Sequence, residues 1–309
     1  MHITRVLITA IITVTLFASA SFGSAIVSGF DSTSDGRNDD GTYSPGGCNN
    51  PADGGDCLAT AVQVPIGLNI NYYGTSFNSL YINTNGNVSL DAPFPYVSGL
   101  LQSPFGLLAS FSEIIAPFFA DVDTRNPASG VVSFGTGTFD GFTAFGVNWL
   151  NVGYFNDNVD KLDNFQMLLV DRSDTGAGNF DLIFNYGSMQ WETGDADFGM
   201  DGLGGFSAIV GFTDGTGNPA DTLELPGSSI PGSFIDGGTN ALDVNSLNSN
   251  VPGRYIFDFR DGAYVVTPEP RMSALLGALM LVLLLFQRIP RFYGAFRARV
   301  QAKPGQMPS

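Results

Sequence analysis

Hydrophobic residues in the middle of the chain recur in short runs, separated by segments rich in Gly, Asp, Asn and Ser. The clearest pair of runs is FQMLLV at 165–170 and FDLIFNY at 180–186. The first is apolar on both faces apart from Gln166, whereas the second alternates apolar and polar positions. The intervening DRSDTGAGN favours a chain reversal, because Gly adopts positive φ and Asp, Asn and Ser bond locally to the backbone. A hairpin with this much apolar surface needs cover, so we expect it at the centre of a layered β domain.

Further runs of the same kind predict more strands, at 62–70, 79–82, 88–90, 114–120, 131–134, 142–152, 206–212 and 254–259. The Asn-Gly pair within 83–87 is a strong hairpin signal between two of them. Pro and Gly interrupt 91–112, which predicts a loop. The pattern therefore predicts an all-β, β-sandwich-like single domain over 62–266, preceded by an irregular Gly- and Asp-rich loop over 26–61.

The two ends of the chain have a different character. Residues 1–25 predict a secretory signal peptide, with Arg5 before an apolar run at 6–18 and the small residues of Ala18-Ser19-Ala20 after it. Residues 23–25 form a second candidate cleavage site. An uncleaved anchor is the alternative, but the apolar run is shorter than the roughly 20 residues that span a bilayer.

At the other end, Pro268, Glu269 and Pro270 precede an uncharged apolar run at 272–286 and a basic tail. This order, over 267–309, resembles the PEP-CTERM sorting signal of Gram-negative bacteria. The resemblance implies a membrane-anchored precursor with a C-terminal hydrophobic transmembrane helix, which an exosortase-type protease processes. It also implies delivery to the cell surface or to an extracellular exopolysaccharide matrix. A plain single-span anchor is the alternative.

The charge of the chain is distributed unevenly. All 29 acidic residues lie between Asp31 and Glu269, where only six basic residues occur, so this part carries a net charge of −23. Such a surface repels phosphate backbones, which argues against a nucleic-acid partner. It favours divalent cations instead.

Several motifs in a fixed order resemble one family: SLYINTNGNVSL, IAPFFADVDTR, NFQMLLVDR, FDLIFNYGSMQW, AIVGF, LELPGS and VPGRYIFDF, with RNDDG at 37–41 upstream. Together they resemble the nidogen-like extracellular (NIDO) domain, over roughly residues 29–261. The resemblance implies an extracellular β-rich module linked to cell–matrix adhesion. It implies no catalytic activity.

The inventory of reactive side chains also argues against an enzyme. The only histidine is His2, in the predicted signal, so the rest of the chain has no imidazole for a triad, a proton relay or a metal site. Cys48 and Cys57 are the only cysteines, and in an exported chain we expect them to form a disulfide. Paired carboxylates, as in glycoside hydrolases, are the remaining catalytic chemistry.

Calcium is the cofactor that the sequence favours, if any is bound, because spaced carboxylates are Ca²⁺ ligands. The candidates are Asp195, Asp197 and Asp201 in one Gly-rich segment, and Asp121 and Asp123 in another. A turn in which Arg125 pairs with the second group is the alternative for that group.

Large aromatic side chains are candidates for glycan contact. Trp149, Tyr154 and Trp191 would form a sugar platform if they were exposed, and core packing is the alternative. The sequence as a whole predicts a non-enzymatic exported surface or matrix protein in adhesion or matrix structure, with extracellular polysaccharide or surface proteins as partners. A carbohydrate-binding protein of the exopolysaccharide layer is the second hypothesis, and a glycoside hydrolase is the third.

Overall fold

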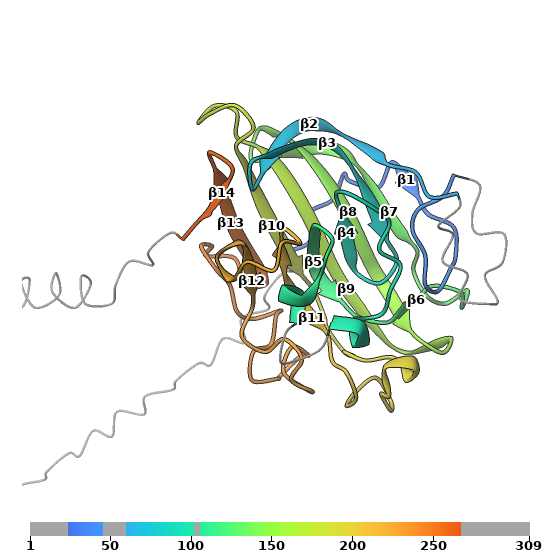
Figure 1. Ribbon diagram of the computed structural model, residues 1–309. Coiled ribbons are helices and arrows are strands. Elements are labelled where there is room, and N and C mark those ends of the chain that lie inside the picture. Colours follow the sequence, from blue (N-terminus) through green and yellow to red (C-terminus); the bar gives the residue numbers. More distant parts are fainter. Residues whose placement is uncertain (1–23, 46–59, 102–105, 267–309) are drawn as a thin grey trace, which may run out of the picture. The chain divides into compact units, whose positions relative to one another are not determined.

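The computed structural model describes residues 24–45, 60–101 and 106–266, which form two antiparallel β-sheets (Figure 1). Within these ranges there is no α-helix, and no helical segment has the length and apolarity that a membrane crossing requires. The predicted Cys48–Cys57 disulfide, most of the predicted signal peptide and the predicted C-terminal sorting helix lie outside the described residues. The prediction of an all-β fold is confirmed for the described part.

The larger sheet has the strand order β1-β7-β8-β9-β10-β13-β14, and β6 pairs with β8. Its strands are β1 (Thr33–Ser34), β6 (Val122–Asp123), β7 (Val132–Phe139), β8 (Phe142–Tyr154), β9 (Asn158–Asp171), β10 (Phe180–Tyr186), β13 (Arg254–Arg260) and β14 (Ala263–Val265).

The smaller sheet has the order β12-β11-β5-β4-β3-β2. Its strands are β2 (Val64–Tyr72), β3 (Thr75–Asn83), β4 (Asn87–Ser89), β5 (Ile114–Phe119), β11 (Ile209–Thr213) and β12 (Thr222–Glu224). Short 3₁₀ segments lie in the connections, at η2 (Ser98–Leu101), η3 (Gly106–Ala109), η4 (Asp195–Asp197) and η5 (Pro219–Asp221).

The hairpin predicted at 165–186 is confirmed as β9 and β10, in the middle of the larger sheet. Phe180 pairs with Asp171 at the turn, and Tyr186 pairs with Phe165 at the open end. β9 begins at Asn158, earlier than the apolar run suggested, because its mixed N-terminal half pairs with β8. Pairing with a neighbouring strand thus extends β9 beyond its hydrophobic pattern.

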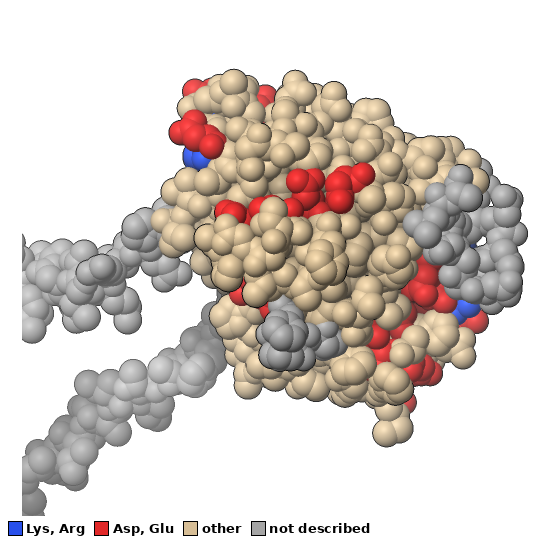
Figure 2. Space-filling view, viewed as in Figure 1, with Lys and Arg blue, Asp and Glu red and all other residues tan. Residues whose placement is uncertain are grey.

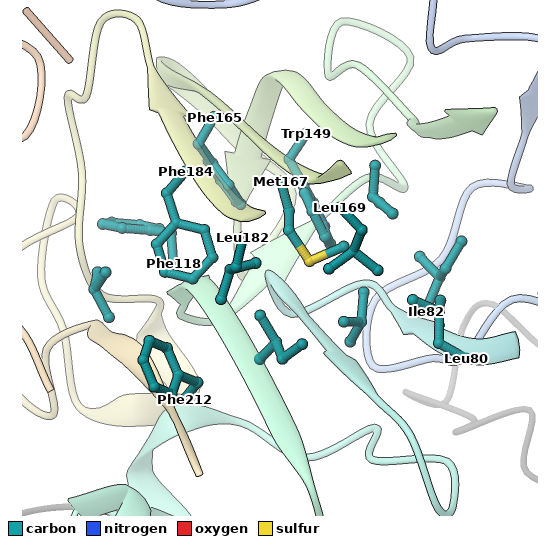
Figure 3. Packing of buried hydrophobic residues seen from close by; sticks show 14 of the residues in the cluster. Leu80, Ile82, Phe118, Trp149, Phe165, Met167, Leu169, Leu182, Phe184 and Phe212 are labelled. Atoms are coloured by element: carbon teal, nitrogen blue, oxygen red, sulfur yellow. The ribbon is translucent and has the colours of Figure 1, made fainter. Parts of the chain in front are cut away.

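The core between the sheets is filled by aromatic and aliphatic side chains, several of which Figure 3 shows. From β9, Phe165, Met167 and Leu169 point into this core. The ring of Trp149 on β8 stacks on Phe165, with centroids 5.1 Å apart and planes 11° from parallel, and Phe118 from the smaller sheet lies 5.3 Å from the same phenyl ring. These contacts hold the two sheets together by burying apolar area.

The outer face of each sheet is also covered, which explains why the run at 165–170 is apolar on both sides. Leu168 of β9 packs with Phe30, which belongs to the N-terminal segment, here residues 25–44. On the smaller sheet, Phe119 of β5 packs with Phe94 and Leu107 from the long β4–β5 connection. Irregular chain therefore serves as the outermost layer on both sides.

The predicted hairpin turn at 83–87 joins β3 to β4 and packs against β5. Gly86 has φ +72, and a Cβ there would lie 1.8 Å from the carbonyl oxygen of Phe118. The Phe118 amide donates to the Gly86 carbonyl at 3.2 Å, and Trp149 Nε1 donates to the Thr84 carbonyl at 2.9 Å. Only glycine fits this close approach of backbone to backbone.

A buried carboxylate anchors the chain after β10 to β9. Asp163 is fully buried, and its Oδ1 accepts hydrogen bonds from the amides of Gln190 and Trp191, while Oδ2 has no hydrogen-bond partner. Burial raises the pKa of Asp163 well above its usual value, and the two amide bonds oppose that shift only in part.

We predict that Asp163→Asn gains stability relative to the parent chain as the pH rises. The raised pKa means that the folded parent binds more protons than the unfolded chain, so its stability is complete below about pH 4 and falls as the pH rises above that. The amide that replaces the carboxyl group does not ionise, so the stability difference between the variant and the parent grows by at most about 1.4 kcal/mol per pH unit between about pH 4 and the raised pKa. Urea unfolding of the variant and the parent at about pH 4 and about pH 8 measures this stability difference.

Asp160→Asn is the matched control, because Lys161 and Tyr154 lower the pKa of Asp160 through hydrogen bonds. This variant loses stability relative to the parent as the pH rises, which is the opposite sign. A stability difference between Asp163→Asn and the parent that does not change with pH would contradict the prediction.

Candidate metal centre

Three carboxylates from distant parts of the sequence meet at one edge of the larger sheet. Asp39 and Asp40 lie in the N-terminal segment, and Asp121 lies between β5 and β6. One oxygen from each carboxylate lies within 4.8 Å of the others. Asp39 and Asp121 are buried and Asp40 is half-buried. We call these three residues the acidic cluster.

Arg37 fixes the N-terminal segment beside the loop that follows β6. Its Nη1 donates to the carbonyls of Thr124, Asn126 and Ser129 at 2.7, 2.7 and 2.9 Å, and its Nη2 donates to the Pro127 carbonyl at 3.1 Å. A guanidinium suits this role because its donors form a rigid fork. Four carbonyls of this loop therefore point at the Arg37 guanidinium, which holds the loop in place.

Asn38 completes the attachment directly before the two aspartates. Its amide donates to Thr124 Oγ1 at 2.9 Å, and its carbonyl accepts from the Thr124 amide at 2.9 Å. Its side-chain oxygen accepts from Thr84 Oγ1 in the β3–β4 turn. The backbone of Asp39 and Asp40 is therefore held between the turn and β6, which fixes the direction of both side chains.

Asp121 is placed by its own neighbours. The Val122 amide donates to Asn85 Oδ1 at 2.9 Å, and the Asp121 carbonyl accepts from the Phe155 amide at 3.1 Å. The carboxylate lies against Gly194, where a Cβ would come within 2.2 Å of Oδ2. Glycine at 194 therefore leaves the room that this carboxylate occupies.

The acidic cluster holds more negative charge than its surroundings neutralise. The pKa of Asp121 is raised to about 9, first by burial and then by Asp40, Asp197, Asp39 and Asp123. The pKa of Asp39 is raised to about 8, again first by burial and then by Asp40. Each carboxylate makes ionisation of the others harder.

The neighbouring arginine does not relieve this charge, although it touches the cluster. Arg125 Nη2 lies 3.2 Å from Asp39 Oδ2, but the same nitrogen lies 2.6 Å from Asp123 Oδ2. Arg125 Nε also donates to both oxygens of Asp123, at 3.0 and 3.1 Å. The guanidinium therefore pairs mainly with Asp123. Its weaker attraction for Asp39 lowers the pKa of Asp39 less than burial raises it.

The aspartates that the sequence grouped as two candidate calcium sites do not stay together in the structure. Asp121 lies in the acidic cluster, whereas Asp123 forms the ion pair with Arg125 that was the alternative for it. Asp195 and Asp201 are exposed. Asp197 is buried and accepts from Ser98 Oγ at 2.7 Å and from the Gly99 amide at 3.1 Å. A cation at Asp195–Asp201 stays a prediction.

Sequence reasoning missed Asp39 and Asp40 as candidate ligands. Their pattern, two adjacent aspartates in RNDDG, is not a metal-ligand spacing, and their partner Asp121 is remote in sequence. The available signal was the motif itself, which accompanies the strand motifs upstream. Reading it as part of the folded domain would have placed two carboxylates near β6.

The predicted glycan platform is not formed. Trp149, Tyr154 and Trp191 are all buried in the core between the sheets. Trp191 Nε1 donates to the Val152 carbonyl at 3.0 Å, so the polar atom of that indole is satisfied internally. Trp149 and Tyr154 point inward from β8, and Trp191 packs inward from the connection after β10, so core packing, the alternative to glycan contact, holds for all three.

A pocket of about 390 Å³ adjoins the acidic cluster. Its lining includes Tyr96, Leu100, Phe198 and Phe206, together with Asp40 and Asp197. Phe198 is 78% exposed and Leu100 is 60% exposed, which is unusual for apolar side chains in one place. On the face that Figure 2 shows, acidic residues gather in patches and basic residues are few.

Comparison with known families agrees with the motifs. The family model described as "Nidogen-like domain" (NIDO) matches residues 78–261, which is more than half of the chain. The chain belongs to the NIDO family. The NIDO match covers Asp121 but begins after Asp39 and Asp40, so two of the three carboxylates lie outside it.

Curated relatives match more than half of this chain. Alpha-tectorin of Homo sapiens is 30% identical over an alignment of 220 residues, which covers 63% of this chain and 9% of that protein. Nidogen of Drosophila melanogaster is 29% identical over an alignment of 206 residues, which covers 61% of this chain and 14% of that protein. The chain thus spans only a small part of the length of each. No solved structure matches the chain significantly.

We predict that Arg125→Ala destabilises the cation-free NIDO domain by about 3 kcal/mol, because Asp123 is then a buried charge without its partner. Arg172→Ala is the matched control. Its partner Asp174 is largely exposed, and its other partner Asp181 keeps Arg260, so the loss there is about 1 kcal/mol or less. Urea unfolding in chelator measures both, and equal losses would contradict the argument.

Proposed function

We propose that this protein is a non-enzymatic, exported surface or matrix protein that acts in adhesion or in matrix structure. The NIDO match over 78–261 carries the proposal, with the similarity to alpha-tectorin and nidogen in support. The chemistry of the chain agrees with this role. Its single histidine is His2, so acid–base catalysis by imidazole is not open to the body of the protein.

We further propose the pocket beside the acidic cluster as the contact surface. Exposed apolar side chains that gather at one place typically mark interaction sites, and Phe198 and Leu100 do so here. Asp40 and Asp197 add negative charge to the same lining. The complementary partner is a surface protein that inserts an apolar side chain next to a basic one.

Polysaccharide is the weaker partner hypothesis on these observations. The two tryptophans, which stack best on sugars, are internal, and two of the exposed rings at the pocket are phenylalanines without a polar edge. The proposal therefore commits to a protein partner. Binding to purified polysaccharide is the outcome that distinguishes the alternative.

We also propose the route to the surface. The predicted signal peptide starts export, and the segment 267–309, with Pro268, Glu269 and Pro270, retains the precursor for sorting. Ala25 is buried, and its carbonyl accepts a hydrogen bond from Arg254 Nη2 at 3.0 Å. This contact favours cleavage after Ala20 over cleavage after Ala25, because only the former leaves Ala25 in the mature chain.

The adhesion proposal predicts saturable binding of the purified full chain to protease-sensitive material on the surface of cells that export it. Phe198→Ser should weaken that binding at least about tenfold, because it removes the most exposed apolar side chain of the pocket. Phe111→Ser is the matched control, since Phe111 is 95% exposed but does not line the pocket. Equal binding by both variants, or binding to protease-treated polysaccharide alone, would refute the pocket assignment.

The sorting proposal predicts that a chain ending at residue 266 is secreted into the medium, whereas the full chain stays with the cell envelope or matrix. Replacing Pro268 and Pro270 by Ala, with the apolar run intact, should trap the precursor in the membrane because the processing motif is lost. Cell fractionation and the mass of the mature chain provide the measurement. Normal processing of the double variant would instead support a plain anchor.

A further inference from the structure

We propose that the carboxylates of Asp39, Asp40 and Asp121 bind one Ca²⁺ ion, which fastens the N-terminal segment to the junction of β5 and β6. This inference goes beyond the proposed function, because neither the NIDO match nor the adhesion role assigns a metal. It rests on the geometry of the acidic cluster and on the burial of Asp121, whose carboxylate oxygens have no hydrogen-bond partner among the described residues.

Asp121 supplies the observation that points to a ligand. Its side chain is only 1% exposed, and neither carboxylate oxygen has a hydrogen-bond partner. Asp39 is 3% exposed, and its Oδ1 also has no partner. Buried carboxylate oxygens are normally satisfied by a hydrogen bond or an ion, because an unsatisfied one destabilises the fold. Three such atoms in one cluster indicate a group that accepts electron pairs from all of them.

Among the residues that the structure describes, no nearby side chain provides that group. Asp123 has its own partners, because Arg125 contacts both of its oxygens and the Asp157 amide donates to Oδ2 at 2.9 Å. Asn85 Nδ2 donates to Asp40 Oδ1 at 2.6 Å, which holds the half-buried carboxylate at the mouth of the cluster. The polar neighbours thus orient the cluster without neutralising it, as groups around a metal site do.

The donor set and its spacing favour calcium. All three donors are hard oxygens, with no imidazole or thiolate, which suits Ca²⁺ or Mg²⁺ rather than transition metals. Oxygens that each lie about 2.4 Å from one Ca²⁺ are at most about 4.8 Å apart. The three atoms here satisfy that limit. Mg²⁺ demands near-octahedral geometry and usually keeps several waters, so a site built from protein carboxylates suits the more adaptable Ca²⁺ better.

The ion would act on a joint between segments that are distant in the chain. Asp39 and Asp40 come from the segment that covers the outer face of the larger sheet, and Asp121 follows β5 of the smaller sheet. Removing the ion leaves three carboxylates facing one another. Without the ion, no cation bridges these groups, and the docking of residues 37–41 depends on the hydrogen bonds of Arg37 and Asn38 and on the contacts of Arg125 with Asp39 and of Asn85 with Asp40.

The test is thermal unfolding of the full chain in nonionic detergent, with EDTA or with Ca²⁺, and equilibrium dialysis with ⁴⁵Ca²⁺. We expect one bound ion per chain, and a rise in Tm of roughly 5–10 °C when Ca²⁺ is at about 100 times its Kd. Asp121→Asn should weaken Ca²⁺ binding by at least about tenfold. Asp140→Asn, which removes an exposed carboxylate in the turn between β7 and β8, should bind as the parent does.

Asp121→Asn also predicts a crossover that a merely structural role would not produce. In EDTA this variant should melt at least as high as the parent, because a buried carboxyl group without a partner is replaced by an amide that does not ionise. In Ca²⁺ it should melt below the parent, because a ligand has been lost. Asp40→Asn, at a half-buried position, repeats the binding test if Asp121→Asn does not fold.

Three results would overturn the proposal. They are no Tm rise with Ca²⁺, unchanged Ca²⁺ binding in both Asp121→Asn and Asp40→Asn, and an equal rise with Mg²⁺ or with Na⁺ at matched ionic strength. A cluster that instead holds protons would show a dependence of Tm on pH in EDTA without any response to Ca²⁺. Loss of adhesion with normal Ca²⁺ binding would concern the proposed function alone.

Discussion

Apolar side chains on both faces of the central strands are the constraint on which this structure depends. β9 and β10 direct one set of side chains into the core between the sheets and another set outward. Both faces must be shielded from water, because burying each Phe, Leu or Ile side chain contributes about 1.5–3 kcal/mol to the free energy of unfolding. The chain therefore needs a third layer, and the N-terminal segment provides it through Phe30.

That covering layer also places the acidic cluster. Once Phe30 is docked, the following residues run along the edge of the larger sheet, where β1 pairs with β7. Arg37 and Asn38 then reach the loop after β6, and Asp39 and Asp40 arrive beside Asp121. The need to cover one face of the sheet thus brings three carboxyl groups close together at its edge. The cluster is a consequence of how the sheet is covered.

The sequence predicted the parts of the fold that local patterns control. The β9–β10 hairpin and the turn at Gly86 follow from alternation and from turn residues, which act over a few positions. The acidic cluster depends instead on which irregular segment covers which face, and no local pattern encodes that choice. Asp39 and Asp40 were therefore missed, while the spaced aspartates at 195–201, which do look like ligands, are mostly exposed.

The burial of the aromatic residues follows the same logic and bears on function. Trp149 and Trp191 are buried in the core, so the proposed recognition would use side chains that the connections expose, chiefly Phe198 and Leu100. These connections carry Asp197 and adjoin Asp40, and Asp197 contributes to the raised pKa of Asp121. The charge state of the cluster and the wall of the pocket are therefore electrostatically coupled. A ligand that brought positive charge to the pocket and a cation in the acidic cluster would both act on Asp40, so each would change the affinity for the other.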